Sequence, residues 1–224
     1  MDRDYAQAFA WDKKCADLNS PVGETHVGYA YEMGQGVPEN DAEAIVWYRR
    51  AADQDYDVAE YDLALAYQAG KGVAHDEAQA IAWFKKSAEH GYAPAFYDLA
   101  WAYSVDGDTQ DMAAAVYWYE KSAAKGNPNA MNNLGRIYEI GKGVPEDKAK
   151  AAYWYALAAQ RGGAIPQKNL TRTFQYFLNQ PFFKLVEKIY LMAAILGFVF
   201  MVGSIVLIIR IARRPPSLPP GPTT

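Results

Sequence analysis

The fold of this chain is decided by residues 130–162, AMNNLGRIYEIGKGVPEDKAKAAYWYALAAQRG, because most of the preceding sequence consists of copies of this stretch. A column of tryptophans aligns the copies at intervals of 36, 36, 35 and 36 residues: Trp11, Trp47, Trp83, Trp118 and Trp154. Three further columns share this period: Val27, Leu63, Leu99 and Leu134; Tyr31, Tyr67, Tyr103 and Tyr138; and Ala52, Ala88, Ala123 and Ala159. Such a period is typical of an array whose units are single supersecondary motifs.

Each unit is predicted to form a helix, a turn and a second helix. The first half carries apolar or small residues at helical spacing. In three units a Gly-x-Gly-Val turn follows, and its first glycine ends the helix by adopting a left-handed conformation: Gly34, Gly70 and Gly141. Three aspartates are then expected to cap the second helices: Asp41, Asp76 and Asp147. We expect the recurring aromatic and small residues to form the core.

Two parts of the array depart from the pattern. Residues 104–109 replace the glycine turn in the third unit, either as a loop variant without consequence or as a loop reshaped to contact a partner. Residues 4–16 match only the second half of a unit. We expect the packing face before them to be covered by residues 1–5, by another subunit or by preceding sequence.

The chain has an acidic and a basic part. Residues 167–224 contain seven basic residues against Glu187 alone, a balance of +6, which leaves 15 basic and 25 acidic residues, a balance of −10, in residues 1–166. An acidic array repels phosphate backbones, so nucleic acid is not an expected partner. Cys15 is the only cysteine, which excludes an intrachain disulfide, and we expect it to behave as a small buried residue.

With LGRIYEIGKGVPEDKAKAAYWYALAAQRG at residues 134–162 in view, residues 4–165 resemble the Sel-one-like repeat (SLR) family, short relatives of tetratricopeptide repeats. The resemblance implies an all-α, right-handed α-solenoid that acts as an adaptor or assembly scaffold. The expected parts are an N-terminal half-repeat (1–22), four repeats (23–58, 59–94, 95–129 and 130–165), a capping or linker segment (166–181), a transmembrane helix with its flanks (182–213) and a proline-rich tail (214–224).

Residues that vary on the far side of the first helices are candidates for binding a partner. Positions two before, two after and five or six after the Val27 column point away from the packed side. They are Thr25, Tyr29 and Met33; Tyr61, Leu65 and Ala69; Tyr97, Trp101 and Val105; and Asn132, Arg136 and Ile140. We expect a concave strip for a peptide or helix, since tyrosine and tryptophan are favoured anchors. Its predicted contact residues are Tyr29, Tyr61, Leu65, Tyr97, Trp101 and Arg136. The alternative is that these rings pack against the second helices or a neighbouring unit.

A membrane span is predicted at residues 189–209, IYLMAAILGFVFMVGSIVLII, which contain no charge. As a helix of roughly 1.5 Å per residue this segment is about 31 Å long, close to the thickness of a hydrocarbon core. Ala193 and Gly197 form a small-x-x-x-small pair that favours contact with another membrane helix. The N-terminus shows no export signal, so we expect a C-terminal anchor with cytoplasmic repeats. The alternative places the repeats in the periplasm or the endoplasmic reticulum lumen.

Signals for catalysis are absent from the sequence pattern. His26, His75 and His90 lie in different units without ligand spacing, so no metal site is expected. The segments 70–72 and 141–143 are expected to be turns, because they lack the full phosphate-loop pattern. The SLR proteins linked to β-lactam hydrolysis depend on paired cysteines in each repeat, which this chain lacks. We therefore expect no enzyme, no cofactor and no small-molecule substrate.

Together these observations favour a scaffold that is anchored in the lipid bilayer and holds a protein partner next to it, as an accessory or assembly subunit of a larger membrane complex. A client-recognition adaptor in protein quality control is the alternative, and an SLR-type hydrolase is a more remote one.

Overall fold

The structure, a computed structural model, describes residues 4–105, 111–162, 164–181 and 184. Within these ranges the chain forms ten α-helices and no strand, which confirms the predicted all-α class. The helices are α1 (Tyr5–Asp17), α2 (Pro21–Met33), α3 (Asp41–Ala52), α4 (Asp57–Ala69), α5 (Glu77–Glu89), α6 (Ala93–Ser104), α7 (Met112–Ala124), α8 (Pro128–Ile140), α9 (Lys148–Gln160) and α10 (Ala164–Leu178).

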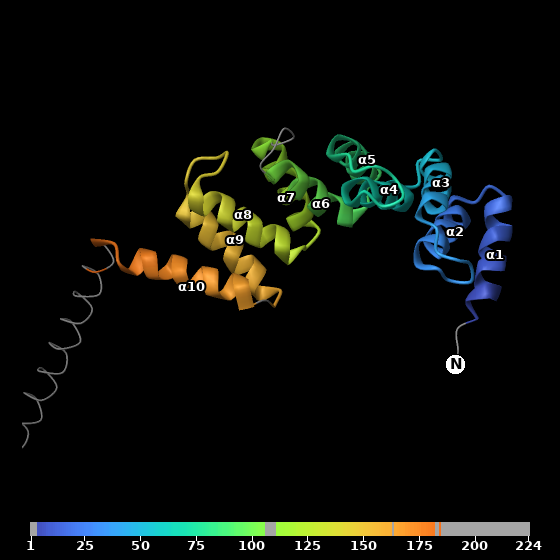
Figure 1. Cartoon of the computed structure of the whole chain (residues 1–224). Helices are drawn as coiled ribbons and strands as arrows, with labels where there is room; N and C mark the ends of the chain where they lie inside the picture. Colours follow the sequence, from blue (N-terminus) through green and yellow to red (C-terminus); the bar gives the residue numbers. More distant parts are fainter. Residues whose placement is uncertain (1–3, 106–110, 163, 182–183, 185–224) are drawn as a thin grey trace, which may run out of the picture. The chain divides into compact units, whose positions relative to one another are not determined.

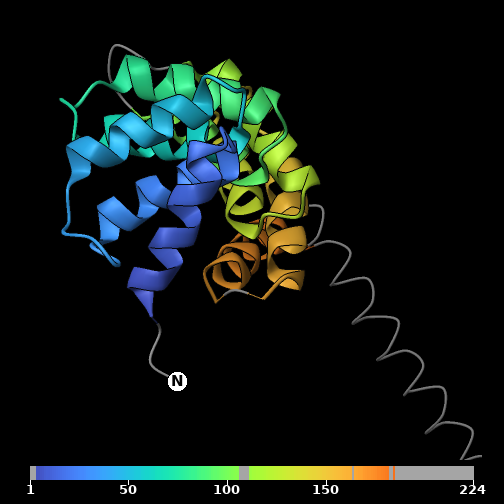
Figure 2. The same cartoon turned by 90° about the vertical axis from the view of Figure 1, so that its right-hand side faces the viewer.

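Consecutive helices pack as antiparallel pairs that stack in sequence order (Figures 1 and 2). The pairs are α2 with α3, α4 with α5, α6 with α7, and α8 with α9, while α1 packs on α2. The second helix of each pair also contacts the first helix of the next. Contacts are therefore made mainly between neighbours, as in other α-solenoids.

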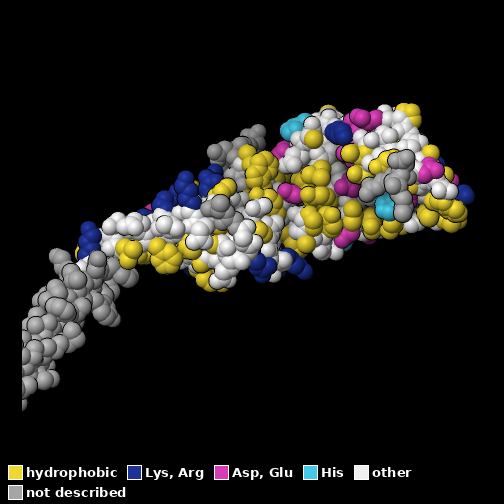
Figure 3. Space-filling model, turned by 90° about the horizontal axis from the view of Figure 1, so that it is seen from below, with side chains coloured by type: hydrophobic (Ala, Val, Ile, Leu, Met, Phe, Trp, Pro, Cys, Tyr) yellow, Lys and Arg dark blue, Asp and Glu magenta, His cyan; other side chains and the backbone are white. Residues whose placement is uncertain are grey.

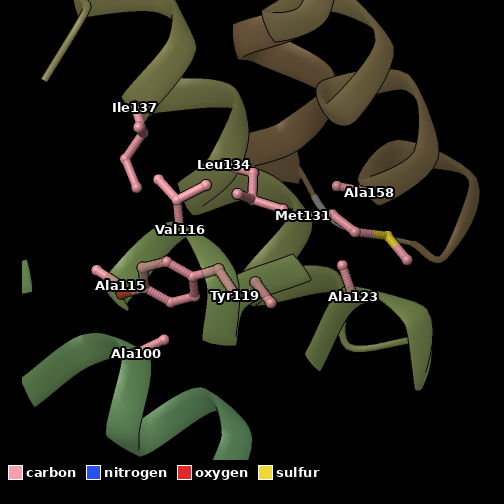
Figure 4. Packing of buried hydrophobic residues seen from close by; sticks show 10 residues of the cluster. Ala100, Ala115, Val116, Tyr119, Ala123, Met131, Leu134, Ile137 and Ala158 are labelled. Atoms are coloured by element: carbon pink, nitrogen blue, oxygen red, sulfur yellow. The ribbon is translucent and has the colours of Figure 1, made fainter. Parts of the chain in front are cut away.

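The recurring aliphatic column lies at the centre of this stack. Its members are completely buried: Val27, Leu63, Leu99 and Leu134. Figure 4 shows the cluster around the last of them, where Val116 and Tyr119 of α7 lie close to Met131 and Leu134 of α8. Burial of each such side chain stabilises the fold by about 1.5–3 kcal/mol. The column predicted to be core from its period is core in the structure.

The turns within the pairs follow the expected glycine chemistry, with one correction. Gly34, Gly70 and Gly141 end their helices with φ values of 63°, 67° and 68°. Asp76 and Asp147 cap α5 and α9, as predicted, by accepting a hydrogen bond from the backbone N–H three residues later. The prediction for Asp41 is wrong. Asn40 caps α3 instead, accepting from the Glu43 N–H at 3.1 Å, and Asp41 is the first residue of the helix.

Two residues of α1 are more exposed than the sequence predicted. Trp47 is 7% exposed, but Trp11, in the same column, is 60% exposed. Each later tryptophan packs in a cluster that includes residues of the preceding second helix, as Trp47 does with Ala16 of α1, and no described helix precedes α1. Cys15 is exposed as well, contrary to the prediction, because its neighbour Ala16 takes the buried position.

The chain divides into two compact parts, Met1–Leu170 and Thr171–Thr224, with the boundary inside α10. In the first part, the side-chain amide of Asn169 donates to Asn132 Oδ1 of α8 at 2.9 Å. None of the helices in the described ranges is both long and apolar enough to cross a bilayer. The predicted span at residues 189–209, with Ala193 and Gly197, lies outside the described residues, as do residues 106–110 of the unusual third loop.

Candidate partner-binding surface

The first helices of the four pairs present a column of exposed side chains on the side away from the core. The column consists of Tyr29, Leu65, Trp101 and Arg136, one from each of α2, α4, α6 and α8. Tyr29, Leu65 and Trp101 are 48%, 38% and 44% exposed. A second exposed column lies about one turn further along each helix: Met33, Ala69, Val105 and Ile140. Figure 3 shows hydrophobic side chains gathered on one face of the molecule, with acidic side chains among them. Exposed apolar residues grouped in this way are typical of interaction surfaces.

The third predicted column is packed rather than free. The ring of Tyr61 lies 5.6 Å from that of Phe84 on α5 and 5.1 Å from that of Tyr92, the N-cap of α6. Tyr97 lies 5.8 Å from Tyr119 in the same way, and Thr25 is 5% exposed. Tyr61 and Tyr97 thus make the ring contacts that the alternative interpretation describes, and both are half-buried. Their contact with a partner stays a prediction.

A cavity of about 130 Å³ opens between α2, α3 and α4 beside Leu65. Its charged lining consists of Glu32, Asp41, Asp62 and Lys71, and its apolar lining includes Leu65 and Ile45. Lys71 lies 3.2 Å from Glu32 Oε1 and 3.3 Å from Asp41 Oδ1. Three carboxyl groups against one ammonium make this first cavity acidic.

Burial changes the acidity of this first cavity. Loss of solvent around Asp62, followed by the nearby charge of Glu32, raises the pKa of Asp62 to about 7. The hydroxyl of Tyr48 donates to Glu32 Oε2 at 2.7 Å. A cationic group placed in this cavity would favour the charged form of Asp62.

A second cavity, of about 210 Å³, occupies the corresponding place between α6, α7 and α8. It is lined by Trp101, Ser104, Met112, Tyr119, Asn133, Arg136, Ile137, Ile140 and Lys142. Here Asn133, at the repeat position of Asp62, donates to the hydroxyl of Tyr119 at 3.1 Å. No acidic side chain is among these lining residues, and two are basic. The two cavities occupy the same repeat positions and carry opposite charge.

The structure also brings together side chains that the sequence spacing did not connect. Ligand-type atoms of Asp55, Glu60 and His90 all lie within 4.8 Å of one another. We expected no metal site because the histidines lie in different units, yet the carboxylates come from the α3–α4 turn and from α4. One signal in the sequence could have found this trio. Two of its three residues are metal-ligating types at positions where the residues 36 places earlier are neutral amides.

The glycine–lysine segments behave as turns. Gly70 and Gly141 are helix C-caps. Lys71, which follows Gly70, makes ion pairs with carboxylates of the preceding helix pair. Neither segment joins a strand to a helix in the described residues, as a phosphate loop would. These segments therefore stabilise the stack.

A family model described as Sel1 repeat matches the chain at residues 1–20, 21–56, 57–92, 93–127 and 128–163. The crystal structure of a Sel1 repeat protein from Oxalobacter formigenes is similar, with 38% identity and a TM-score of 0.66, over 75% of this chain and 69% of that one. The crystal structure of c5321, a protective antigen of uropathogenic Escherichia coli displaying an SLR fold, shows 32% identity and a TM-score of 0.74. That match covers 80% of this chain but only 38% of c5321. No curated protein matches the chain.

Proposed function

We propose the function of this protein from the premise that its chain belongs to the Sel1 repeat family. Proteins of this family generally mediate protein–protein interactions, and their scaffold is typically non-catalytic. We infer that this chain is a membrane-anchored scaffold that binds one protein partner, as an accessory or assembly subunit of a larger membrane complex. The observation that carries the proposal is the exposed column Tyr29, Leu65, Trp101 and Arg136 beside two cavities of opposite charge.

The two cavities define the chemistry of the partner. A basic side chain suits the first cavity, because Glu32 and Asp62 line it. An acidic side chain suits the second cavity, where the exposed Arg136 lies beside Trp101. Apolar side chains between them would cover the exposed column. A peptide or helix with a basic end, an apolar middle and an acidic end therefore fits this surface, and its direction is set by charge.

Trp101→Ala is expected to lower partner capture by roughly 30-fold, since truncation of a central aromatic anchor costs about 2 kcal/mol or more. The measurement is affinity purification of the full chain in mild detergent, with the captured partner quantified. Trp11→Ala is the matched control, because Trp11 is 60% exposed but lies on α1, away from the column. Capture by the Trp11 variant should be unchanged, and both variants should keep the helical melting curve of the parent chain.

The purification also separates the candidate functions. One stoichiometric membrane complex supports the scaffold, whereas many substoichiometric proteins would indicate a client-recognition adaptor. Equal capture by the Trp101 and Trp11 variants would remove this surface from the binding site. Loss of folding in the Trp101 variant would show instead that the ring is part of the core.

Membrane anchoring rests on the uncharged sequence of residues 189–209. A double substitution, Leu196→Arg and Phe200→Arg, is expected to release the chain from membranes into an alkaline carbonate wash, because arginine near the centre of a span costs roughly 2.5–3.5 kcal/mol each. Leu178→Arg, at a position 55% exposed on α10, is the control and should stay in the membrane pellet. Release of the parent chain would contradict anchoring. Protease digestion in sealed vesicles tests the side: repeats digested without detergent are cytoplasmic.

A further inference from the structure

Asp55, Glu60 and His90 form a compact trio at the junction of two helix pairs. Asp55 lies in the turn between α3 and α4, Glu60 in the first turn of α4, and His90 is the C-cap of α5. Their ligand-type atoms lie within 4.8 Å of one another, and His90 Nδ1 is 2.8 Å from Glu60 Oε2. Asp55 and His90 are exposed, whereas Glu60 is completely buried. The trio is thus open to solvent on one side and fixed on the other.

The buried carboxylate is only half satisfied. Glu60 Oε2 is paired with His90, but Glu60 Oε1 is buried and has no hydrogen-bond partner in the described part of the chain. An uncompensated carboxylate oxygen costs free energy in a site without water. The unpaired oxygen is a second observation, separate from the short distances among the three side chains. It indicates that a cation or a hydrogen-bond donor belongs beside Glu60 Oε1.

The same positions of the preceding pair show what compensation looks like. There the trio is Asn19, Glu24 and Gln54. Gln54 donates to Glu24 Oε2 at 2.7 Å and accepts from the Asn19 amide at 3.3 Å. Arg50 Nη2 lies 2.8 Å from Glu24 Oε1, an ion pair that is not aligned as a hydrogen bond. Both oxygens of Glu24 therefore face a protein group.

The second trio differs in each of these respects. Lys86 stands where the first pair has Arg50, and its ammonium lies over the ring of Trp83 at 4.3 Å. Two neutral amides are replaced by the carboxylate of Asp55 and the imidazole of His90. The buried glutamate is kept while its arginine is lost, and the neighbours become residues that ligate metals.

We propose that Asp55, Glu60 and His90 bind a divalent transition-metal cation of the Zn²⁺ type. Two carboxylate oxygens and one imidazole nitrogen supply three ligands, and solvent on the exposed side supplies the remainder. The imidazole selects against Mg²⁺ and Ca²⁺, which prefer oxygen ligands throughout. The last carbonyls of α5 place a partial negative charge beside the cation.

Such a cation would join three segments that belong to two neighbouring pairs. Since the geometry exists only in the folded chain, binding would stabilise this junction by mass action. The site lies apart from the column on α2, α4, α6 and α8, so the proposal stands independently of the partner-binding function.

The test uses the full chain in mild detergent, purified with a tag that contains no histidine and freed of metal with a chelator. Calorimetric titration with ZnCl₂ is expected to show one Zn²⁺ per chain, and Zn²⁺ should raise the melting temperature. The double substitution Asp55→Asn and His90→Gln, which reproduces the amides of the first trio, should lower the affinity at least about tenfold. His75→Gln, at an exposed histidine outside the trio, should bind as the parent does.

Several outcomes would overturn the site. They are no Zn²⁺ binding at about 100 μM, a concentration well above that which a site of biological use requires; equal binding by the parent and the double variant; or equal stabilisation by Mg²⁺ or Ca²⁺. In the first case the trio is an ion pair with protonated His90 only. Asp55→Asn alone keeps the test decisive if the double variant does not fold, because Asp55 is exposed in a turn.

Discussion

Replacing Gly72 by alanine is expected to destabilise the folded chain by about 3 kcal/mol or more, whereas the same change at Gly91 should cost only about 1 kcal/mol. Both glycines have positive φ, 70° and 100°. A Cβ at Gly72 would lie 2.4 Å from the carbonyl oxygen of Asp41, the first residue of α3 in the preceding pair. A Cβ at Gly91 would meet nothing within 4 Å. Gly72→Ala therefore adds a backbone collision between pairs to the strain that both variants share.

Urea unfolding followed by circular dichroism measures both variants against the parent chain. The same contact recurs along the array, since a Cβ at Gly36 would lie 2.3 Å from the Tyr5 carbonyl oxygen, and one at Gly143 would lie 2.2 Å from Met112 Cβ. The second glycine of each Gly-x-Gly-Val turn thus leaves room for the first turn of the second helix of the preceding unit. Equal losses for Gly72→Ala and Gly91→Ala would show that this close approach does not limit the stack.

The second large effect concerns Asp62, whose replacement by asparagine is expected to stabilise the chain at pH values above about 7. The pKa of Asp62 is about 7 in the folded chain and about 3.9 in an unfolded one. Between these pH values the Asp62 carboxyl loses its proton in the unfolded chain but keeps it in the folded chain. The contribution of Asp62 to the free energy of unfolding therefore falls as the pH rises, and it is constant above about pH 7. Three pKa units correspond to about 4 kcal/mol, and partial exposure of Asp62 reduces the expected loss to about 1–2 kcal/mol.

Urea midpoints of the parent and of Asp62→Asn at several pH values provide the measurement. The variant should be more stable at about pH 8, and the difference should shrink towards about pH 3, below both pKa values, where the parent's carboxyl is protonated in both states. Asp53→Asn, at an exposed position that ends α3, is the control and should change little with pH. A difference that grows towards acidic pH would reverse the sign and contradict the burial argument.

Much of the architecture could be predicted because, in a repeat array, the core positions recur with the period of the repeat. Leu63 and Leu99 recur at the same position in every pair, so one buried member implies the others. Local glycine chemistry was sufficient for Gly70, which ends a helix in a left-handed conformation. The cap of α3 was misplaced by one residue because Asn40 and Asp41 are both good capping residues, and only backbone geometry distinguishes them.

The candidate surface could be predicted only in part. Leu65 and Trp101 were recognised as exposed because their helix places them opposite the packed side. Tyr61 has nearly the same helical phase, but Tyr92 and Asp98 of the next pair reach its ring and its hydroxyl. Periodicity within one helix contains no information about a neighbour that stacks on its end, so this difference could not be derived from spacing.

The amino-acid pattern alone therefore established paired helices, their order and their buried column, because those properties depend on local propensity and on a period that repeats along the chain. Stacking between pairs decided the rest. It brought Asp55, Glu60 and His90 together from three segments, set Asp62 beside Glu32, and pressed Gly72 against α3. Each of these contacts joins residues whose distance depends on how one pair lies on the next, and that geometry arises only when the side chains of both pairs pack.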